Sequence, residues 1–139
     1  MSLITKKGGA PISQSVAAII IGLLFVFAGS LHFAAHLQKN YLSIIPPQLP
    51  FPIQLIYLSG CFEILGGISL LIPRFRRAGG IGLILLLLAV FPANIYGAIY
   101  RIPYVPILKQ YPILAWIRLP FQFILIALVG WCSKPRQKN

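Results

Sequence analysis

One stretch of this chain is apolar enough to cross a lipid bilayer and yet carries a single charge. Residues 51–72 read FPIQLIYLSGCFEILGGISLLI, and Glu63 near their middle is the only acidic residue among 139. A run of about 20 predominantly apolar residues predicts a transmembrane helix. An ionisable side chain at membrane depth is costly, so it normally faces the interior of a bundle and finds a polar partner there. The stretch therefore predicts a helix bundle that is organised around Glu63.

The composition also indicates a membrane protein. Hydrophobic residues make up 58% of the chain and charged residues only 9%, whereas soluble domains carry about 25% charged residues. A soluble fold of this length could not enclose so much apolar surface. We expect one folded domain, and we assign residues 1–14 to a flexible lead-in, residues 15–132 to the transmembrane domain and residues 133–139 to a basic tail.

Four apolar segments predict an all-α, four-helix transmembrane bundle. They cover residues 15–33, 51–72, 78–100 and 112–131. Proline disrupts a helix, so we expect the proline-rich connection at 40–51 to be a compact loop rather than a continuous helix, and residues 101–111 make a second proline-rich connection. We expect the first of them to rest on the membrane face and cap the bundle. Pro92 is expected to kink the third segment and to leave a carbonyl near residue 88 for a neighbour to satisfy.

The net charge of +11 does not indicate a nucleic-acid partner, because of where the charges lie. Eight of the twelve basic residues flank apolar segments in three clusters: Lys6 and Lys7; Arg74, Arg76 and Arg77; Lys134, Arg136 and Lys138. Four spans put both termini on one side, and this excess of positive charge there favours cytoplasmic termini. The clusters are also expected to attract anionic lipid head groups. We predict a multi-pass protein of the bacterial inner membrane.

Several polar side chains fall at comparable depth when the helices are laid out with a rise of about 1.5 Å per residue. His32 ends the first span at its outer end, and Asn94 lies in the outer half of the third. Arg118 and Gln122 are one helical turn apart on the fourth span, on the same face. We expect a polar pocket under the proline-rich loops, with Arg118 reaching toward Glu63. The predicted ligand-binding residues are His32, Glu63, Asn94, Arg118 and Gln122.

Each of these residues also has a purely structural interpretation. Glu63 would be a buried ion-pair partner or a protonated carboxyl, and Arg118 would extend to the outer interface. Asn94 and Gln122 would hydrogen-bond neighbouring helices. His32 and His36 have the i, i+4 spacing of metal ligands, but two imidazoles without a nearby carboxylate or thiolate make a weak site, so we predict no metal.

Other site chemistry is disfavoured. Cys61 and Cys132 are far apart in sequence and form no C-x-x-C pair, so each is expected to be a small buried apolar residue. Gly79, Gly80 and Gly82 lie in a spanning segment without the strand that a phosphate loop needs. We expect these glycines to serve helix packing. We identify no residues in the sequence that would bind a cofactor tightly to this protein.

Five short motifs, in order, resemble the DoxX family of small membrane proteins. They are FAGSLHF (27–33), IPPQLP (45–50), SGCFEILGG (59–67), FPANIY (91–96) and RLPFQ (118–122). The resemblance covers nearly all of residues 15–132 and implies a four-helix membrane bundle. It also implies an association with thiosulfate:quinone oxidoreductase and with membrane complexes that defend against thiol or superoxide stress. A more distant eukaryotic relative resembles a receptor-assembly chaperone.

Three functions remain open at this point. The first is a redox-associated subunit that binds a quinone or other lipophilic small molecule, receives electrons from a membrane or peripheral partner protein, and relays protons through Glu63 and His32. The second is a non-catalytic scaffold or assembly factor, in which the polar residues only fix the bundle. The third is a carrier or enzyme for a lipidic substrate. The sequence leaves the ligand, the partner and the oligomeric state undetermined.

Overall fold

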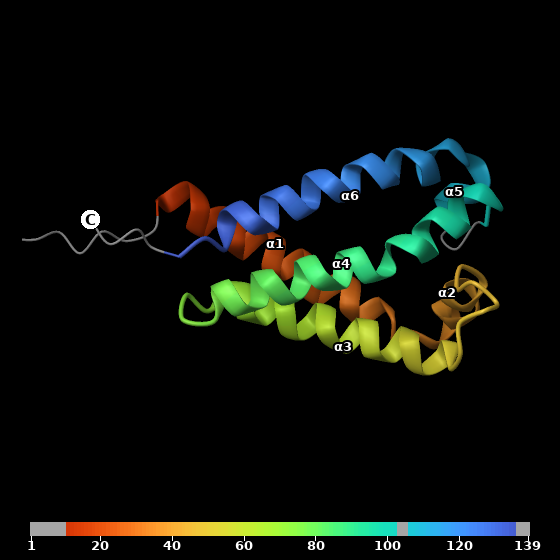
Figure 1. Cartoon of the computed structure of the whole chain (residues 1–139), viewed down its shortest axis with the longest axis horizontal. Coiled ribbons are helices and arrows are strands. Elements are labelled where there is room, and N and C mark those ends of the chain that lie inside the picture. The colour runs from red at the N-terminus through yellow and green to blue at the C-terminus, as the bar shows by residue number, and fades with distance from the viewer. Residues whose placement is uncertain (1–10, 103–105, 136–139) are drawn as a thin grey trace, which may run out of the picture.

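A computed structural model describes residues 11–102 and 106–135. Four long helices dominate it (Figure 1): α1 (Ile12–Leu31), α3 (Pro52–Leu71), α4 (Arg76–Ile99) and α6 (Ile113–Cys132). Each is long and apolar enough to cross a membrane. The described part of the chain contains no β-strand. The predicted all-α bundle of four membrane-spanning helices is confirmed.

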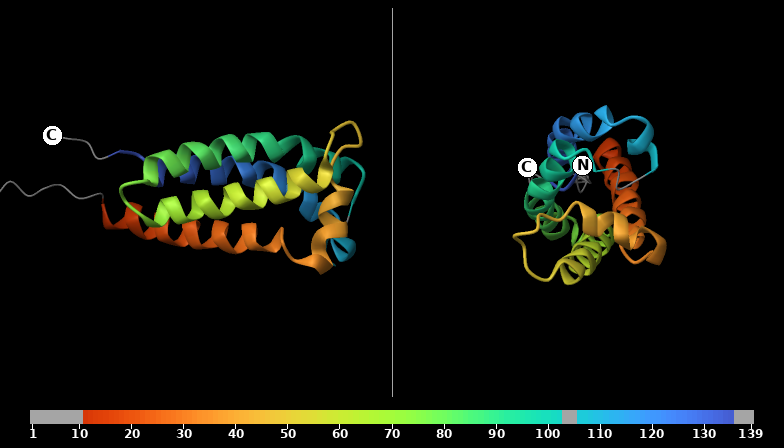
Figure 2. Two further views of the ribbon diagram at one scale, coloured as in Figure 1. Left: turned by 90° about the horizontal axis from the view of Figure 1, so that it is seen from below. Right: turned by 90° about the vertical axis from the view of Figure 1, so that its right-hand side faces the viewer.

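Three short helical elements gather at one end of this bundle, which we call the loop end. They are η1 (Ala35–Leu37), α2 (Gln38–Ser43) and α5 (Pro106–Gln110). The opposite end, the terminal end, holds both ends of the described chain and the tight turn between α3 and α4 (Figure 2). An even number of crossings therefore puts both termini on one side, as predicted. That this side is cytoplasmic stays a prediction from the charge clusters.

The first helix begins earlier than expected. α1 starts at Ile12, directly after Pro11, so residues 12–14 are helical rather than part of a flexible lead-in. Gln14 adds a tie across the terminal end, because its Nε2 donates a hydrogen bond to the backbone oxygen of Trp131 at 2.6 Å. The rest of the predicted lead-in, residues 1–10, and the last four residues of the predicted tail lie outside the described residues.

The connection at 40–51 is partly helical, which corrects the prediction of a loop throughout. α2 continues to Ser43, and helix is absent only from residues 44–51, where Pro46, Pro47 and Pro50 lie. Phe51 has a positive φ of 54°, and it directly precedes Pro52 at the start of α3, a position where the missing N–H of proline costs nothing. The chain thus uses its proline run to reverse direction between α2 and α3.

Glycines set how closely α1 and α3 approach each other. A Cβ added at Gly22 would lie 2.7 Å from the backbone oxygen of Gly67, and one added at Gly29 would lie 2.8 Å from that of Gly60. Small residues allow membrane helices to pack backbone against backbone. The two pairs lie two turns apart on each helix, so this close contact extends along most of α1 and α3.

A second set of glycines brings α3 and α4 together, but only near the terminal end. A Cβ at Gly66 would lie 2.5 Å from the Leu83 side chain, and a Cβ at Gly79 would collide with Ser69. Gly82 has open space around the position of a Cβ, so the expectation that it serves helix packing is wrong. Figure 1 shows the α3 and α4 ribbons diverging from their connecting turn toward the loop end.

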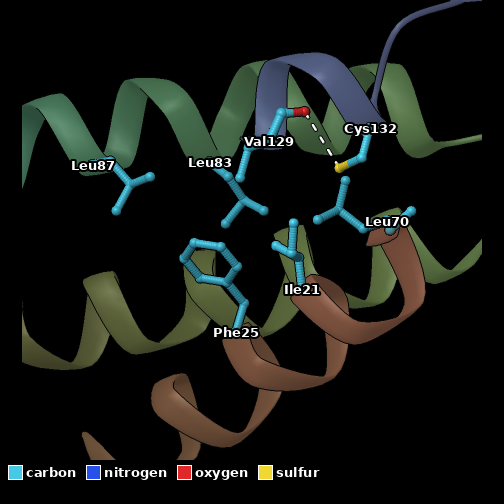
Figure 3. Close-up of a cluster of buried hydrophobic side chains, with 8 residues drawn as sticks. Ile21, Phe25, Leu70, Leu83, Leu87, Val129 and Cys132 are labelled. Carbon is cyan, nitrogen blue, oxygen red and sulfur yellow. Dashed lines mark hydrogen bonds between the residues drawn. The ribbon is translucent and has the colours of Figure 1, made fainter. Parts of the chain in front are cut away.

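The main apolar core fills the half of the bundle nearest the termini. Side chains from all four long helices converge there (Figure 3): Ile21, Phe25, Leu70, Leu83, Leu87, Val129 and Cys132. Cys132 is buried as predicted, but Cys61 is exposed on the outer surface of α3, which corrects the expectation that both cysteines are buried. At the loop end, a smaller apolar cluster is formed by Ile44, Ala98, Leu108 and Ala115, and the polar residues lie at this end as well.

The glycine contacts give a direct stability test. Gly67→Ala places a Cβ 2.6 Å from the backbone oxygen of Gly22, so α1 and α3 must separate. We expect a cost of about 1–3 kcal/mol, read as a lower Tm of the purified protein in detergent. Gly82→Ala is the matched control: it meets no neighbour, and its better helix propensity should leave Tm unchanged or slightly raised. Equal effects of the two substitutions would contradict this packing.

Candidate functional site

A cavity of about 310 Å³ lies at the loop end between α3 and α4, and it extends to the end of α1 and to α6. Its wall is mostly apolar, with Ile44, Ile45 and Leu49 of the first connection among its lining residues. The polar lining residues are His32, Tyr41, Ser59, Glu63, Asn94 and Arg118. The structure therefore brings four of the five predicted site residues, from four different helices or helix ends, around one space.

Glu63 is the most constrained of these residues. Its side chain is only 14% exposed, and its Oε2 is fully buried without a hydrogen-bond partner among the described residues. Nε2 of His32 lies 3.6 Å from this oxygen, beyond hydrogen-bond distance. Glu63 occupies the α3 face next to α1, because Gly29 leaves room for its Cβ there. Glu63 therefore lines the cavity while its Oε2 has no hydrogen-bond partner among the described residues.

His32 lies directly after the last residue of α1 and points its ring into the cavity. Its Nδ1 is 3.0 Å from the backbone oxygen of Ile56. A carbonyl can only accept, so Nδ1 carries the proton and Nε2 faces Glu63. Burial lowers the pKa of His32, the hydrogen bond to Ile56 raises it in part, and the positive charge of Arg118 lowers it further. These effects favour a neutral imidazole with its lone pair on Nε2.

Tyr41 belongs to the site, although it is not among the ligand-binding residues predicted from the sequence. Its ring centroid lies 4.5 Å from that of His32. Burial and the Glu63 carboxylate raise the pKa of Tyr41, while Arg118 lowers it. Tyr41 is therefore within electrostatic reach of both charges. It arrives there because α2 folds back over the end of the bundle, and no local sequence pattern signals that fold.

Asn94 and Gln122 form an interhelical hydrogen bond between α4 and α6. Asn94 Nδ2 donates to Gln122 Oε1 at 2.7 Å, and Gln122 Nε2 donates to the backbone oxygen of Leu87. Both side chains are buried. α4 continues through Pro92. The carbonyl that Gln122 satisfies, that of Leu87, lies in the turn before Pro92. It is one residue from position 88, where we expected a carbonyl in need of a partner. Gln122 lies behind the cavity wall, so we revise its role from ligand contact to positioning of Asn94.

Arg118 and His36 differ in their relation to the site. Arg118 is exposed on α6 and also lines the cavity, and its charge affects both His32 and Tyr41. His36 is exposed on η1 and is absent from the cavity lining.

Within residues 11–102 and 106–135, no group of three His, Cys, Asp or Glu side chains could hold a metal ion. The i, i+4 spacing of the two histidines therefore does not bring them to a common site.

Comparison with known proteins assigns the chain to a family. A model of a domain of unknown function, DUF8561, matches residues 21–133, which include all four long helices in whole or in large part. The chain therefore belongs to the DUF8561 family. No curated protein and no solved structure matches it. The family description names no activity. None of these comparisons bears on the resemblance to DoxX proteins, which stays a prediction.

The Asn94–Gln122 pair predicts a loss of stability when it is broken. Gln122→Leu fits the apolar surroundings in size but leaves the Asn94 amide and the Leu87 carbonyl without their partner. An unsatisfied buried polar group costs about 1–3 kcal/mol, so we expect a clear drop in Tm in detergent. Ile124→Leu, at an exposed position on the same helix, is the control and should leave Tm unchanged. A Gln122→Leu protein as stable as wild type would refute the pairing.

The contact between His32 and Ile56 predicts which ring nitrogen is protonated. In a His36→Asn variant, His32 is the single histidine. Its ¹⁵N spectrum at about pH 8, above the ordinary histidine pKa of about 6.5, should show the proton on Nδ1. A spectrum with the proton on Nε2 would exclude the bond to the Ile56 carbonyl.

Proposed function

We propose that this DUF8561 protein is a redox-associated membrane subunit that binds a quinone or a similar lipophilic small molecule in the loop-end cavity. The observation that carries the proposal is Glu63, which lines the cavity and whose buried Oε2 has no hydrogen-bond partner in the described chain. Buried polar atoms almost always have a partner. A ligand that fills the cavity and hydrogen-bonds this oxygen would supply one.

The other lining residues suit the head group of such a ligand. Asn94 and Arg118 carry N–H donors and line the cavity from α4 and α6, so they would bind carbonyl oxygens. Leu55, Ile56 and Val90 provide apolar surface for a ring. Ligand sites in proteins typically combine such an apolar wall with a few convergent polar groups.

His32 and Glu63 provide a place for a proton beside that head group. Nδ1 of His32 is held by Ile56, and Nε2 faces the Glu63 carboxyl at 3.6 Å. A single proton can therefore rest on either partner, and a small movement would let it pass between them. A bound quinone supplies two-electron, two-proton redox chemistry. The electrons would come from a partner protein, as the resemblance to DoxX proteins suggests.

The setting of the site follows from the rest of the chain. The four spans support a multi-pass membrane protein, and the basic clusters of the sequence favour cytoplasmic termini. We place the protein in the bacterial inner membrane, with the cavity in the outer half of the bilayer. The cavity would then be reached by molecules dissolved in the membrane.

A scaffold function is the alternative, and the Asn94–Gln122 hydrogen bond is the observation that favours it. Two of the predicted polar residues pair with each other and with a backbone carbonyl, which is what a purely structural cluster would do. On this alternative, Glu63→Gln and Arg118→Met would lower the stability of the bundle without altering the turnover of a partner enzyme. Removal of Pro46–Pro50 would then abolish partner binding in pull-downs.

The decisive experiment titrates a soluble decyl-benzoquinone into the protein in lipid nanodiscs. We expect saturable binding that Glu63→Gln weakens by about tenfold, the factor that corresponds to about 1.4 kcal/mol, because hydrogen bonds to charged groups contribute about 1.5–3 kcal/mol. Arg118→Met should have a comparable effect. Ile124→Leu, on the outer surface of α6, is the control and should bind as wild type does.

Two results would refute the quinone proposal. The first is the absence of saturable binding to the wild-type protein. The second is unchanged binding by a folded Glu63→Gln protein, since the proposal depends on this carboxyl. Tm and gel-filtration profiles of each variant separate a loss of binding from a loss of fold.

A further inference from the structure

One wall of the loop-end cavity is open to the lipid. Leu58 and Phe62 both line the cavity, and each is 53% exposed on the surface of the bundle. They are one turn apart on α3, so they share a face of that helix. Ala89 of α4 also lines the cavity and is exposed. These three residues, which we call the portal, connect the cavity with the hydrocarbon around the protein.

The portal exists because of how α3 and α4 pack. Near the terminal end, Gly66 and Gly79 bring the two helices into close contact. Toward the loop end, α4 presents the small side chains of Ala89 and Ala93 to the cavity. Two alanines cannot fill the space that opens between diverging helices. The opening is thus built into the sequence of both helices and lies at the depth of acyl chains rather than at the membrane surface.

The other sides of the cavity are more polar or are covered in part by the first connection, although Leu49 and Arg118 also line the cavity and are exposed. The first connection lies over the loop end, where Ile44 is buried. His32 and Glu63 form the wall toward α1, and Asn94, backed by Gln122, contributes to the wall toward α6. The three portal residues are all apolar, which sets this opening apart from the side of the cavity that Arg118 lines.

The volume of the cavity limits what fits inside it. At about 310 Å³ it is at the lower end of the roughly 300–1,000 Å³ found for small-molecule sites. It accommodates one ring-sized head group and leaves no room for a long chain. Any hydrocarbon chain on the ligand must therefore lie outside the cavity, and the portal is the apolar way out.

We infer that the ligand is a single-chain amphiphile whose head occupies the cavity and whose hydrocarbon chain leaves between α3 and α4, past Leu58, Phe62 and Ala89. This inference rests on the proposed function, because it assumes that the cavity binds a lipophilic molecule. It adds the ligand class and the orientation: the head lies against Glu63 and Asn94, and the chain lies in the bilayer. The ligand would then enter sideways from the membrane.

Photo-crosslinking tests the path of the chain. Phe62 is replaced by the photoreactive p-benzoyl-phenylalanine, and the protein in nanodiscs is illuminated with the decyl-benzoquinone. We expect an adduct on the decyl chain that excess short-chain methyl-benzoquinone prevents. The same replacement at Phe121, an exposed position on α6 at similar distance from the loop end, is the control. It should give at most about one-tenth of the adduct, the ratio expected for an affinity difference of about 1.4 kcal/mol.

A second pair of variants tests the portal without a photoreactive group. Ala89→Leu narrows the portal, whereas Ala127→Leu makes the same change at an exposed position on α6. We expect Ala89→Leu to weaken binding of decyl-benzoquinone by about tenfold, or about 1.4 kcal/mol, and to weaken binding of methyl-benzoquinone clearly less. Ala127→Leu should change neither.

The outcomes separate this inference from the function on which it rests. Saturable binding of both quinones, combined with equal crosslinking at positions 62 and 121 and no chain-length effect of Ala89→Leu, would overturn the lateral path and leave the proposed function standing. The absence of saturable binding to the wild-type protein would overturn both.

Discussion

The structure depends on the cost of holding one carboxyl group inside a membrane. Glu63 cannot face lipid cheaply, and α3 accordingly turns it toward α1 and the cavity. His32 is held beside it by the Ile56 carbonyl rather than by Glu63 itself. The carboxyl is therefore protected from lipid, and its Oε2 has no hydrogen-bond partner among the described residues. An arrangement of this kind leaves Glu63 able to interact with something else.

Helix packing decides where the space around Glu63 opens. The α1–α3 contact is tight over two glycine pairs, so no cavity can form on that side. The α3–α4 contact is tight only near its connecting turn, and the alanines of α4 leave space farther along. The core of large apolar residues fills the terminal half of the bundle. The site thus lies beside the α1–α3 glycine contacts, beyond the α3–α4 glycine contacts and beyond the main core.

The polar residues divide into two groups with different roles. Asn94 and Gln122 satisfy each other and the Leu87 carbonyl, and they hold α4 against α6. His32, Tyr41, Glu63 and Arg118 face the cavity and influence one another through their charges. Asn94 belongs to both groups, since it lines the cavity while its side chain is fixed by Gln122. A rigid network behind a polar pocket keeps the pocket in shape without occupying it.

The sequence by itself determined the four spans, their order and the helix that carries the single carboxyl. It did so because a bilayer demands about 20 apolar residues in each crossing and because proline runs end helices. Only the tertiary structure decided that Tyr41 joins the site, that Gln122 lies behind it, that Cys61 is exposed, and that the cavity opens between α3 and α4. These features depend on the rotation of each helix about its axis and on the distance between neighbours. Both are fixed by contacts between residues far apart in the chain, such as Gly66 with Leu83, and a hydrophobic segment that is apolar on all sides carries no signal for them.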